Sequence, residues 1–383
     1  MSGGGLTRRE SLAVVAGLAV GVAAPAAAFT AEPQSLQKVA AAGGRRFGSC
    51  FKWGPPGADL GSFANPHYAE LLIRDCGLLV PENELKWQAL RPAPDRFAFA
   101  RFDAMLGWAE AHGFAMRGHN LLWNQPKWMP AWERSYDFGA APSKRAAAML
   151  TTHIRTVCDR YGTRIGSYDV VNETVDPKTG GLHETNLSRA IGGTVETVDL
   201  AFRTAREAAP HAELVYNDYM SWEPGNERHR AGVLKLLETL KARGTPVDAL
   251  GVQSHIATAG PDVAGTVAKQ EAEWRRFLDA VVAMGLKLVV TEFDVHDNGL
   301  PPDVAVRDRA VADYARAYLD LMLSYPALRD VLAWGMSDRY TWLDRAQPRT
   351  DGRPRRACPY DDHFRAKPLR EAIAGAPAGA PRR

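Results

Sequence analysis

Short apolar runs alternate with amphipathic stretches along the chain, and this alternation constrains the fold more than any other feature. Eight apolar runs have the length of β-strands, at residues 47–51, 77–80, 115–119, 166–172, 213–217, 249–253, 287–291 and 331–336. Stretches with apolar residues at three- and four-residue spacing, typical of helices, lie at 102–112, 143–161, 194–209, 227–242, 267–284 and 304–323. Eight strands with intervening helices predict a parallel sheet closed into a (β/α)8 TIM barrel of the α/β class.

An open, doubly wound sheet is the alternative arrangement for such a pattern. No glycine-rich dinucleotide motif or phosphate-binding loop follows an early strand, which disfavours the open sheet. The 383 residues suit one large barrel, because such barrels use about 250 residues as a single domain. No linker rich in Ser, Thr or Pro interrupts the chain, so we expect a single domain at 46–374.

The first 28 residues have the three parts of a signal peptide: a positive start, an apolar run at 12–24 and small residues at 26–28. Arg8 and Arg9 favour the twin-arginine export route over a general secretory signal or a buried helix. We therefore expect an exported protein, periplasmic or secreted. Residues 29–45 are predicted to form a flexible leader, and the Gly/Ala/Pro-rich residues 375–383 a disordered tail.

Charge and cysteine content exclude several classes of protein. The net charge of +3 is too small to indicate a nucleic-acid or membrane partner, and no later segment has the roughly 18 apolar residues of a membrane span. The four cysteines at 50, 76, 158 and 358 are widely spaced, which favours buried thiols, with one disulfide formed after export as the alternative. No pattern of metal ligands occurs, so we expect no metal and no cofactor. We also expect a monomer.

Polar side chains follow the apolar runs where a barrel places its chemistry. They are Glu82-Asn83, His119-Asn120, Asn172-Glu173, Asn217-Asp218, Gln253-Ser254-His255, Glu292 and Trp334. The carboxyl ends of the strands in a TIM barrel meet at one face, and that face carries the active site. Seven such strand ends, rich in carboxylates, amides and histidines, predict one shared site.

Two of these residues have the chemistry of a glycoside hydrolase. Glu173 ends the fourth predicted strand and Glu292 the seventh, which places them on facing walls of the barrel. Hydrolysis of a glycosidic bond requires two carboxyl groups, one to protonate the leaving oxygen and one to attack the anomeric carbon or activate water. We therefore predict that Glu173 and Glu292 are the catalytic residues.

The motifs around these glutamates resemble those of the family 10 glycoside hydrolases, chiefly endo-β-1,4-xylanases. The resemblance runs from about residue 47 to 369, in family order, and is carried by 81–87, 117–123, 169–173, 216–219, 251–255, 291–295 and 334–342. It implies a retaining mechanism in which Glu173 is the acid/base and Glu292 the nucleophile. It also implies that His255 hydrogen-bonds Glu292 and is held by Asp294, and that Asn172 donates to the sugar 2-hydroxyl.

The resemblance further implies a cleft for xylan or xylo-oligosaccharides. Its substrate-binding residues would be Glu82, Asn83 and Lys86, then His119, Trp123 and Gln253 around the cleaved sugar, and an aromatic wall of Trp334 and Trp342. The segment 123–128 is more compact than its counterpart in the family, and Thr174 and Thr341 replace the usual residues. A retaining barrel enzyme acting on a β-glucan and a non-catalytic sugar-binding protein are the alternatives.

Overall fold

The computed structural model describes residues 1–2 and 34–381. The chain divides into two units, residues 1–33 and 34–383. The predicted signal peptide, apart from its first two residues, lies outside the described residues. The fold and the site described below belong to the second unit.

Eight parallel strands close into a barrel, as predicted. Each strand pairs with the next around the ring, and the pairings of β6 with β8 and of β1 with β9 close it. The ring consists of β1 (Arg46–Phe51), β2 (Leu78–Pro81), β3 (Ala115–Trp123), β4 (Ser167–Asn172), β5 (Glu213–Asp218), β6 (Ala249–Val252), β8 (Lys287–His296) and β9 (Leu328–Ala333). A ninth strand, β7 (His255–Ala257), pairs only with β8.

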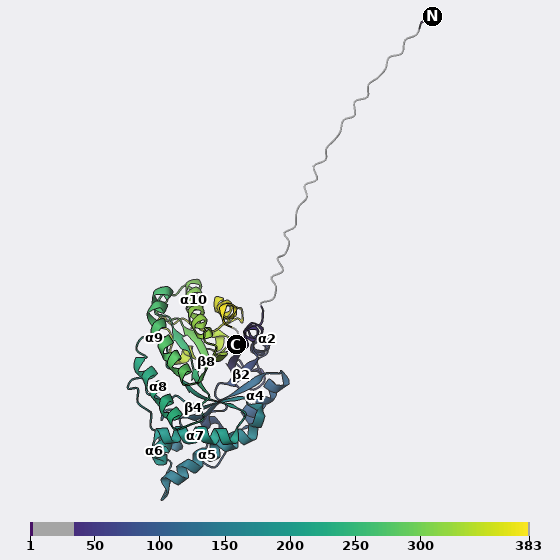
Figure 1. Cartoon of the computed structure of the whole chain (residues 1–383). Coiled ribbons are helices and arrows are strands. Elements are labelled where there is room, and N and C mark those ends of the chain that lie inside the picture. The colour runs from purple at the N-terminus through teal and green to yellow at the C-terminus, as the bar shows by residue number, and fades with distance from the viewer. Residues whose placement is uncertain (3–33, 382–383) are drawn as a thin grey trace. The chain divides into compact units, whose positions relative to one another are not determined.

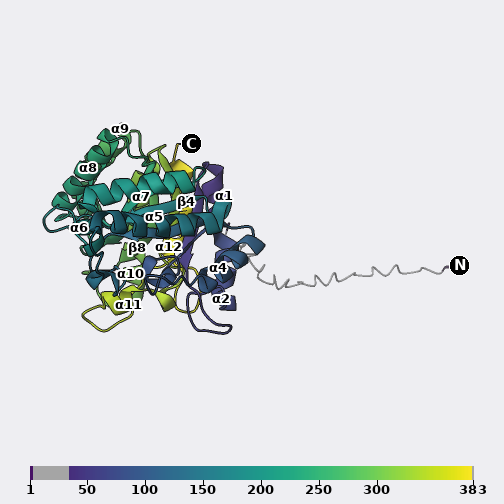
Figure 2. The same ribbon diagram turned by 90° about the horizontal axis from the view of Figure 1, so that it is seen from below.

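Helices surround the strands (Figures 1 and 2). The six predicted helices are α4 (Ala100–Ala111), α5 (Pro142–Tyr161), α7 (Thr194–Ala208), α8 (Glu227–Ala242), α9 (Val263–Ala283) and α10 (Val304–Leu323). Two further helices of eight or more residues were not predicted, α2 (Pro66–Asp75) and α12 (Pro368–Gly375). The shorter helices are α1 (Leu36–Ala42), α3 (Trp87–Leu90), α6 (Asn186–Ile191) and α11 (Leu343–Ala346).

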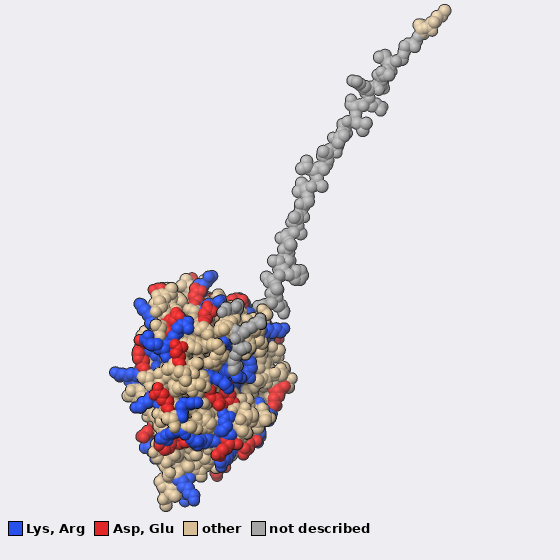
Figure 3. Space-filling view, in the orientation of Figure 1, with Lys and Arg blue, Asp and Glu red and all other residues tan. Residues whose placement is uncertain are grey.

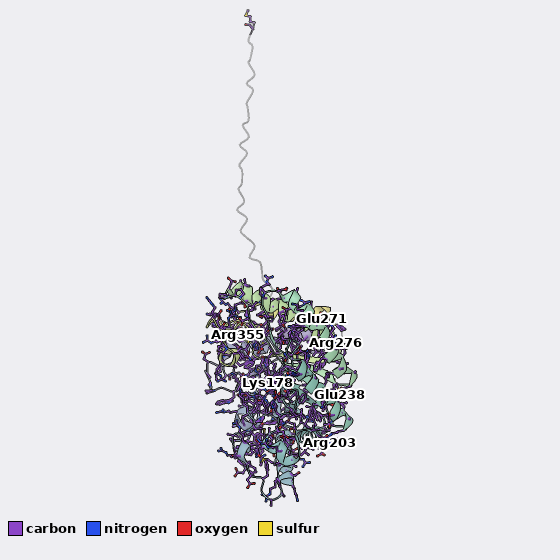
Figure 4. All side chains as sticks on the ribbon, turned by 90° about the vertical axis from the view of Figure 1, so that its left-hand side faces the viewer. Lys178, Arg203, Glu238, Glu271, Arg276 and Arg355 are labelled. Carbon is purple, nitrogen blue, oxygen red and sulfur yellow. The ribbon has the colours of Figure 1, made fainter. Side chains whose placement is uncertain are left out.

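The core has two layers. Apolar side chains inside the barrel form a small cluster that includes Val215, Val289 and Trp334. A much larger cluster fills the space between strands and helices, because each helix turns its apolar stripe to the sheet and its polar face to water. The outer faces of α7, α8 and α9 carry exposed residues such as Arg203, Glu238 and Arg276 (Figure 4).

The surface has no dominant sign of charge. Lys and Arg side chains are interspersed with Asp and Glu over the face shown in Figure 3, consistent with the net charge of +3.

Among the helices of the described residues, none combines the length and the apolar character that a membrane span requires. All four cysteines are buried free thiols. This agrees with the favoured expectation of buried thiols and not with the alternative of one disulfide.

The predicted flexible leader is wrong for the part of it that the structure describes. Ser35 caps α1, and the backbone N–H of Leu36 donates to the Asp75 carboxylate at 3.1 Å. Leu36 and Ala40 are buried in the main apolar cluster. α1 packs against β1, α2 and α12, and burial of the apolar surface of Leu36 and Ala40 holds the segment in place.

The predicted disordered tail is also wrong through residue 381. Residues Ala376–Gly379 form a short 3₁₀ turn, and Ala376 is buried beside α1 and α12. The guanidinium of Arg45 donates to the carbonyl oxygen of Pro381 at 3.1 Å. The two ends of the catalytic domain therefore pack against each other, which composition alone did not reveal.

Two strands continue at least four residues beyond their predicted carboxyl-terminal ends, and both extensions carry site residues. β3 continues to Trp123, and β8 continues to His296. Pairing with β4 holds the end of β3, whereas β7 pairs with the end of β8 and places His255 opposite Asp294. Glu292 consequently lies within β8, on the same face as Asp294 and His296, because side chains two apart on a strand share a face.

Candidate active site

Glu173 and Glu292 both lie at the carboxyl-terminal face of the barrel. Glu173 follows β4, and its backbone N–H donates to the carbonyl oxygen of Asn217 on β5 at 2.9 Å. Its φ of 51° is the left-handed conformation, which is uncommon for a residue with a side chain and occurs at functional sites. Glu292 donates its backbone N–H to the carbonyl oxygen of Gln253, also at 2.9 Å.

Three side-chain amides connect the two carboxyl groups. Asn217 Nδ2 donates to Glu292 Oε1 at 2.8 Å and to Asn172 Oδ1 at 2.8 Å. Gln253 Nε2 donates to Glu173 Oε1 at 2.8 Å and approaches Asn172 Oδ1 at 3.5 Å. The amide network sets the position of each carboxyl group relative to the other. Asn172 Nδ2 is buried and has no hydrogen-bond partner among the described residues.

The surroundings of Glu173 favour its protonated form. Burial raises the pKa of Glu173 to about 7, and the nearby negative charges of Asp218 and Glu292 act in the same direction. Hydrogen bonds donated by Gln253 and by the indole of Trp123, the latter at 2.9 Å, oppose this shift only in part. A carboxylic acid with this pKa can donate a proton near neutral pH.

The surroundings of Glu292 favour its ionised form. Burial alone would raise the pKa of Glu292, but a hydrogen bond from His255 and the positive charges of His119, His255 and Lys86 bring it down to about 2. His255 Nε2 lies 3.4 Å from Glu292 Oε2. The two carboxyl groups of the site are therefore driven to opposite protonation states, which is the arrangement of an acid and a nucleophile.

Asp294 holds His255 in its charged form. Asp294 Oδ1 lies 2.9 Å from His255 Nδ1, and its Oδ2 accepts a hydrogen bond from Trp342 Nε1 at 2.8 Å. Burial would lower the pKa of His255, but the charge and hydrogen bond of Asp294, together with Glu292, raise it to about 10. The histidine therefore presents an N–H to Glu292 throughout the neutral range.

The polar residues predicted to bind a second sugar also lie together. Lys86 Nζ donates to Asn83 Oδ1 at 3.0 Å, and Asn83 Nδ2 donates to Glu82 Oε1 at 3.3 Å. Lys52, which sequence reasoning missed, pairs with Glu82 at 3.1 Å. Lys86 also lies over the ring of Trp123, with Nζ 4.6 Å from the centroid, so this cluster adjoins the indole that contacts Glu173.

The remaining predicted residues form an aromatic wall near Glu292. The ring of Trp334 packs edge to face against His119, with 5.5 Å between centroids, and the ring of Trp342 lies 5.0 Å from that of His255. His119 Nδ1 is 2.9 Å from the buried carboxylate of Asp169. The structure thus brings all thirteen predicted site residues to one face of the barrel.

The sequence places Asn217 and Asp218 among the polar strand ends that predict the shared site, but it assigned neither residue a role. Asp218 is fully buried and accepts hydrogen bonds from His229 Nε2 at 2.9 Å and from Tyr216 Oη at 2.5 Å. The hydroxyl of Tyr216 also lies 3.3 Å from the backbone N of Thr174, next to Glu173. Both residues end β5 within the motif 216–219, so their position was a usable signal. Their partners on α8 and β8 could not be read from the sequence.

A glycine on β6 makes room for Asn217. A Cβ atom at Gly251 would lie only 2.4 Å from Asn217 Oδ1, far inside contact distance. Asn217 Oδ1 accepts a hydrogen bond from Thr291 Oγ1 at 2.7 Å, which turns its amide nitrogen toward Glu292. The small residue on the neighbouring strand is therefore part of how the amide network is built.

Comparisons with known proteins agree with this geometry. The family model of glycosyl hydrolase family 10 matches residues 35–376. The chain is 31% identical to endo-1,4-beta-xylanase C of Paenibacillus barcinonensis over 329 residues, covering 81% of this chain and 29% of that protein. It is 30% identical to exoglucanase XynX of Acetivibrio thermocellus over 325 residues, 81% of this chain and 27% of that protein. It thus spans under a third of either relative.

A solved structure matches at nearly full length. Xylanase 10B of Thermotoga petrophila RKU-1, determined in complex with xylobiose, superposes with a TM-score of 0.77 at 27% identity, covering 91% of this chain and 98% of that one. The family match spans the whole barrel and every residue of the site. The chain therefore belongs to glycosyl hydrolase family 10.

Proposed function

We propose that the chain is a retaining endo-1,4-β-xylanase with Glu173 as acid/base and Glu292 as nucleophile. The observation that carries the proposal is the opposite protonation of two carboxyl groups held by one amide network. Family membership and the similarity to xylanases support the same reaction and substrate class.

The first step forms a glycosyl-enzyme. Glu292 attacks the anomeric carbon as an ionised carboxylate, while protonated Glu173 gives its proton to the oxygen of the leaving sugar. The C–O bond to the leaving group breaks as the new ester bond forms. The unpartnered Asn172 Nδ2 is available to donate to the 2-hydroxyl, a bond that strengthens as the transition state gains oxocarbenium character.

The second step returns the free enzyme. Once Glu292 is esterified it carries no negative charge, so one of the charges that raises the pKa of Glu173 disappears. Ionised Glu173 then removes a proton from water, and the water oxygen displaces the Glu292 carboxylate from the anomeric carbon. The change in charge on one residue thus converts the other from acid to base.

The cleft chemistry supports a sugar polymer as substrate. The Glu82, Asn83 and Lys86 cluster offers charged and amide hydrogen-bonding groups, and Trp334 and Trp342 offer rings for the C–H faces of sugars. The β-glucan alternative gains weight from the 30% identity to a protein named an exoglucanase. Release of reducing ends from xylan compared with carboxymethylcellulose separates the two substrates, and we expect xylan to be preferred by at least about 100-fold in kcat/KM, a difference of about 2.7 kcal/mol.

Glutamine variants test the two assigned roles. Glu173→Gln and Glu292→Gln should each lower kcat on xylan by at least about 1,000-fold, because each removes one half of the acid–nucleophile pair. Glu207→Gln, an exposed position on α7 paired with Arg155, is the matched control and should retain activity. Undiminished hydrolysis by either site variant contradicts the roles, and an inverted first-formed anomer in an NMR time course contradicts the retaining mechanism.

We also propose that the enzyme is exported through its first 28 residues. The support is the arginine pair, apolar run and small residues at the start of the sequence. Expression of the full chain should yield a processed protein that begins near Phe29, detected by intact mass. Substitution of Arg8 and Arg9 by Lys should leave unprocessed protein in the cytoplasm if the twin-arginine route is used.

A further inference from the structure

We propose that His255, Asp294 and His296 form a binding site for a zinc-like divalent cation, and that metal bound there inhibits the enzyme. The three side chains can each offer one ligand atom, and these atoms all lie within 4.8 Å of one another. Two imidazoles and one carboxylate are a donor set that suits zinc, copper or nickel rather than magnesium or calcium. The inhibition, though not the binding, rests on the proposed function.

His296 has an unused ligand atom that points at the cluster. The residue is 5% exposed, and its Nε2 has no hydrogen-bond partner among the described residues. This nitrogen lies 3.6 Å from Asp294 Oδ1, which is too long for a hydrogen bond. His296 Nε2 is therefore available to an ion that Asp294 Oδ1 also contacts.

The spacing of the ligand atoms fits a tetrahedral ion. Zinc bonds of about 2.0–2.2 Å place two ligand atoms of a tetrahedral site about 3.4 Å apart. The contacts to Asp294 Oδ1 are 2.9 Å from His255 Nδ1 and 3.6 Å from His296 Nε2, which bracket that value. The two imidazole nitrogens lie within 4.8 Å of each other, so an ion that replaces the proton between His255 and Asp294 would draw the side chains together, and a water molecule would supply the fourth ligand.

The groups behind the three ligands would hold them in place. His255 turns its other nitrogen to the Glu292 carboxylate, which is the carboxylate–histidine–metal arrangement that orients ligands in zinc sites. Trp342 binds Asp294 through Oδ2 and leaves Oδ1 for the ion. Arg355, whose positive charge would oppose a cation here, is paired with Asp297 at 3.0 Å.

The backbone presets the cluster. Asp294 and His296 lie two apart on β8 and so share a face, and the register of β7 places His255 opposite Asp294 and Ala257 opposite His296. The backbone carbonyl of His296 also accepts a hydrogen bond from Thr258 N at 2.9 Å. The position of all three ligands is thus set by strand pairing rather than by a mobile loop.

Metal bound at this site would weaken the nucleophile. The ion takes the place of one proton on His255 Nδ1, so binding releases that proton and adds one net positive charge near Glu292. The added charge stabilises the carboxylate of Glu292 in the free enzyme more than in the glycosyl-enzyme, where the charge on Glu292 is gone. We therefore expect zinc to lower kcat, and a chelator to restore it.

Calorimetric titration with zinc chloride, after dialysis against a chelator, measures binding without reference to hydrolysis. The wild-type chain should bind one equivalent of zinc, and His296→Gln should weaken that binding at least about tenfold. Loss of a residue that only supports a ligand already weakens metal binding about 10- to 100-fold, so loss of a ligand should cost at least as much. Zinc inhibition of xylan hydrolysis should weaken in parallel, with little change in activity without metal. If His296→Gln is poorly folded, His296→Phe keeps a ring against Trp342 and removes the ligand.

His363 provides the matched control, because Asp361, Asp362 and His363 form the other group of possible ligands among the described residues. His363→Gln should bind zinc and be inhibited like the wild type. Three outcomes would each overturn the site. The first is equal zinc affinity in the wild type and both His296 variants, and the second is loss of binding in His363→Gln. The third is no binding to the wild type at 1 mM zinc, which corresponds to about 4 kcal/mol of binding free energy. One-equivalent binding without inhibition would overturn the inhibition, and a protein that binds zinc but never cleaves xylan would refute only the proposed function.

Discussion

Trp342 Nε1 donates a 2.8 Å hydrogen bond to Asp294 Oδ2. This bond leaves the other carboxylate oxygen of Asp294 facing His255 Nδ1 at 2.9 Å, and His255 in turn faces Glu292. A tryptophan expected only to line the cleft therefore also orients the residues behind the nucleophile. Through Asp294, its indole nitrogen helps to hold His255 in the charged form, while its ring is expected to contact the sugar.

Trp342→Phe should separate these two roles, because phenylalanine keeps an aromatic ring and loses the donor. Removal of a hydrogen bond to a charged group costs about 1.5–3 kcal/mol, so we expect kcat to fall about tenfold or more, with a smaller change in KM. Steady-state kinetics on xylo-oligosaccharides measure both constants. An increase in KM alone, with kcat unchanged, would show that the ring only binds sugar.

Asn217→Ala should uncouple the amide network from the nucleophile. The substitution removes the donor that reaches both Glu292 and Asn172, and leaves two buried acceptors without that partner. We expect kcat/KM on xylan to fall about 10- to 100-fold, since one hydrogen bond to a buried charge is lost. Asn226→Ala, at the start of α8 away from the network, is the control and should behave like the wild type.

The pH dependence of kcat/KM should follow the two carboxyl groups. The active form has ionised Glu292, with a pKa of about 2, and protonated Glu173, with a pKa of about 7. Activity should therefore decline as the pH rises through about 7, because Glu173 loses the proton that it must donate. A profile measured from pH 4 to pH 9 on a small xylo-oligosaccharide tests this, and an alkaline limb near pH 5 would contradict it.

Asp218→Asn should move that alkaline limb to lower pH. Asp218 is one of the two carboxylates whose negative charges raise the pKa of Glu173, and the substitution removes that charge while keeping a similar shape. We expect a shift of about one pH unit with a smaller change in maximal rate. Asp137→Asn, on an exposed loop, should leave the profile unchanged, and an unmoved limb in Asp218→Asn would show that Asp218 acts only structurally.

Glu173→Gln should stabilise the folded protein above neutral pH. The pKa of Glu173 is raised in the folded state, so its contribution to stability is fully present below its unfolded pKa of about 4.3 and is lost as the pH rises through about 7. A neutral glutamine does not incur this loss, and the gain should be about 3–4 kcal/mol at pH 8. Thermal unfolding of both proteins at pH 4 and pH 8 checks the expectation, and an equal difference at the two pH values would contradict it.

Much of the barrel could be predicted because its causes are local in the sequence. Eight apolar runs separated by amphipathic stretches predicted every strand of the ring and six of the helices. The polar residues at the strand ends, including Glu173 and Glu292, followed from the same pattern, since a closed parallel barrel brings the carboxyl ends of its strands to one face. The leader and the tail were predicted wrongly because their order comes from packing against each other and α12, not from their own composition.

The sequence by itself determined which residues reach the face of the barrel, because strand position and the two-residue alternation place each side chain. Only the tertiary structure decided how those residues interact. The amide network from Asn217 to Glu173, the charge of Asp218 behind the acid and the approach of His296 to Asp294 all join residues on different strands. Protonation states depend on burial and on charges a few ångströms away, and those distances exist only once the barrel has closed.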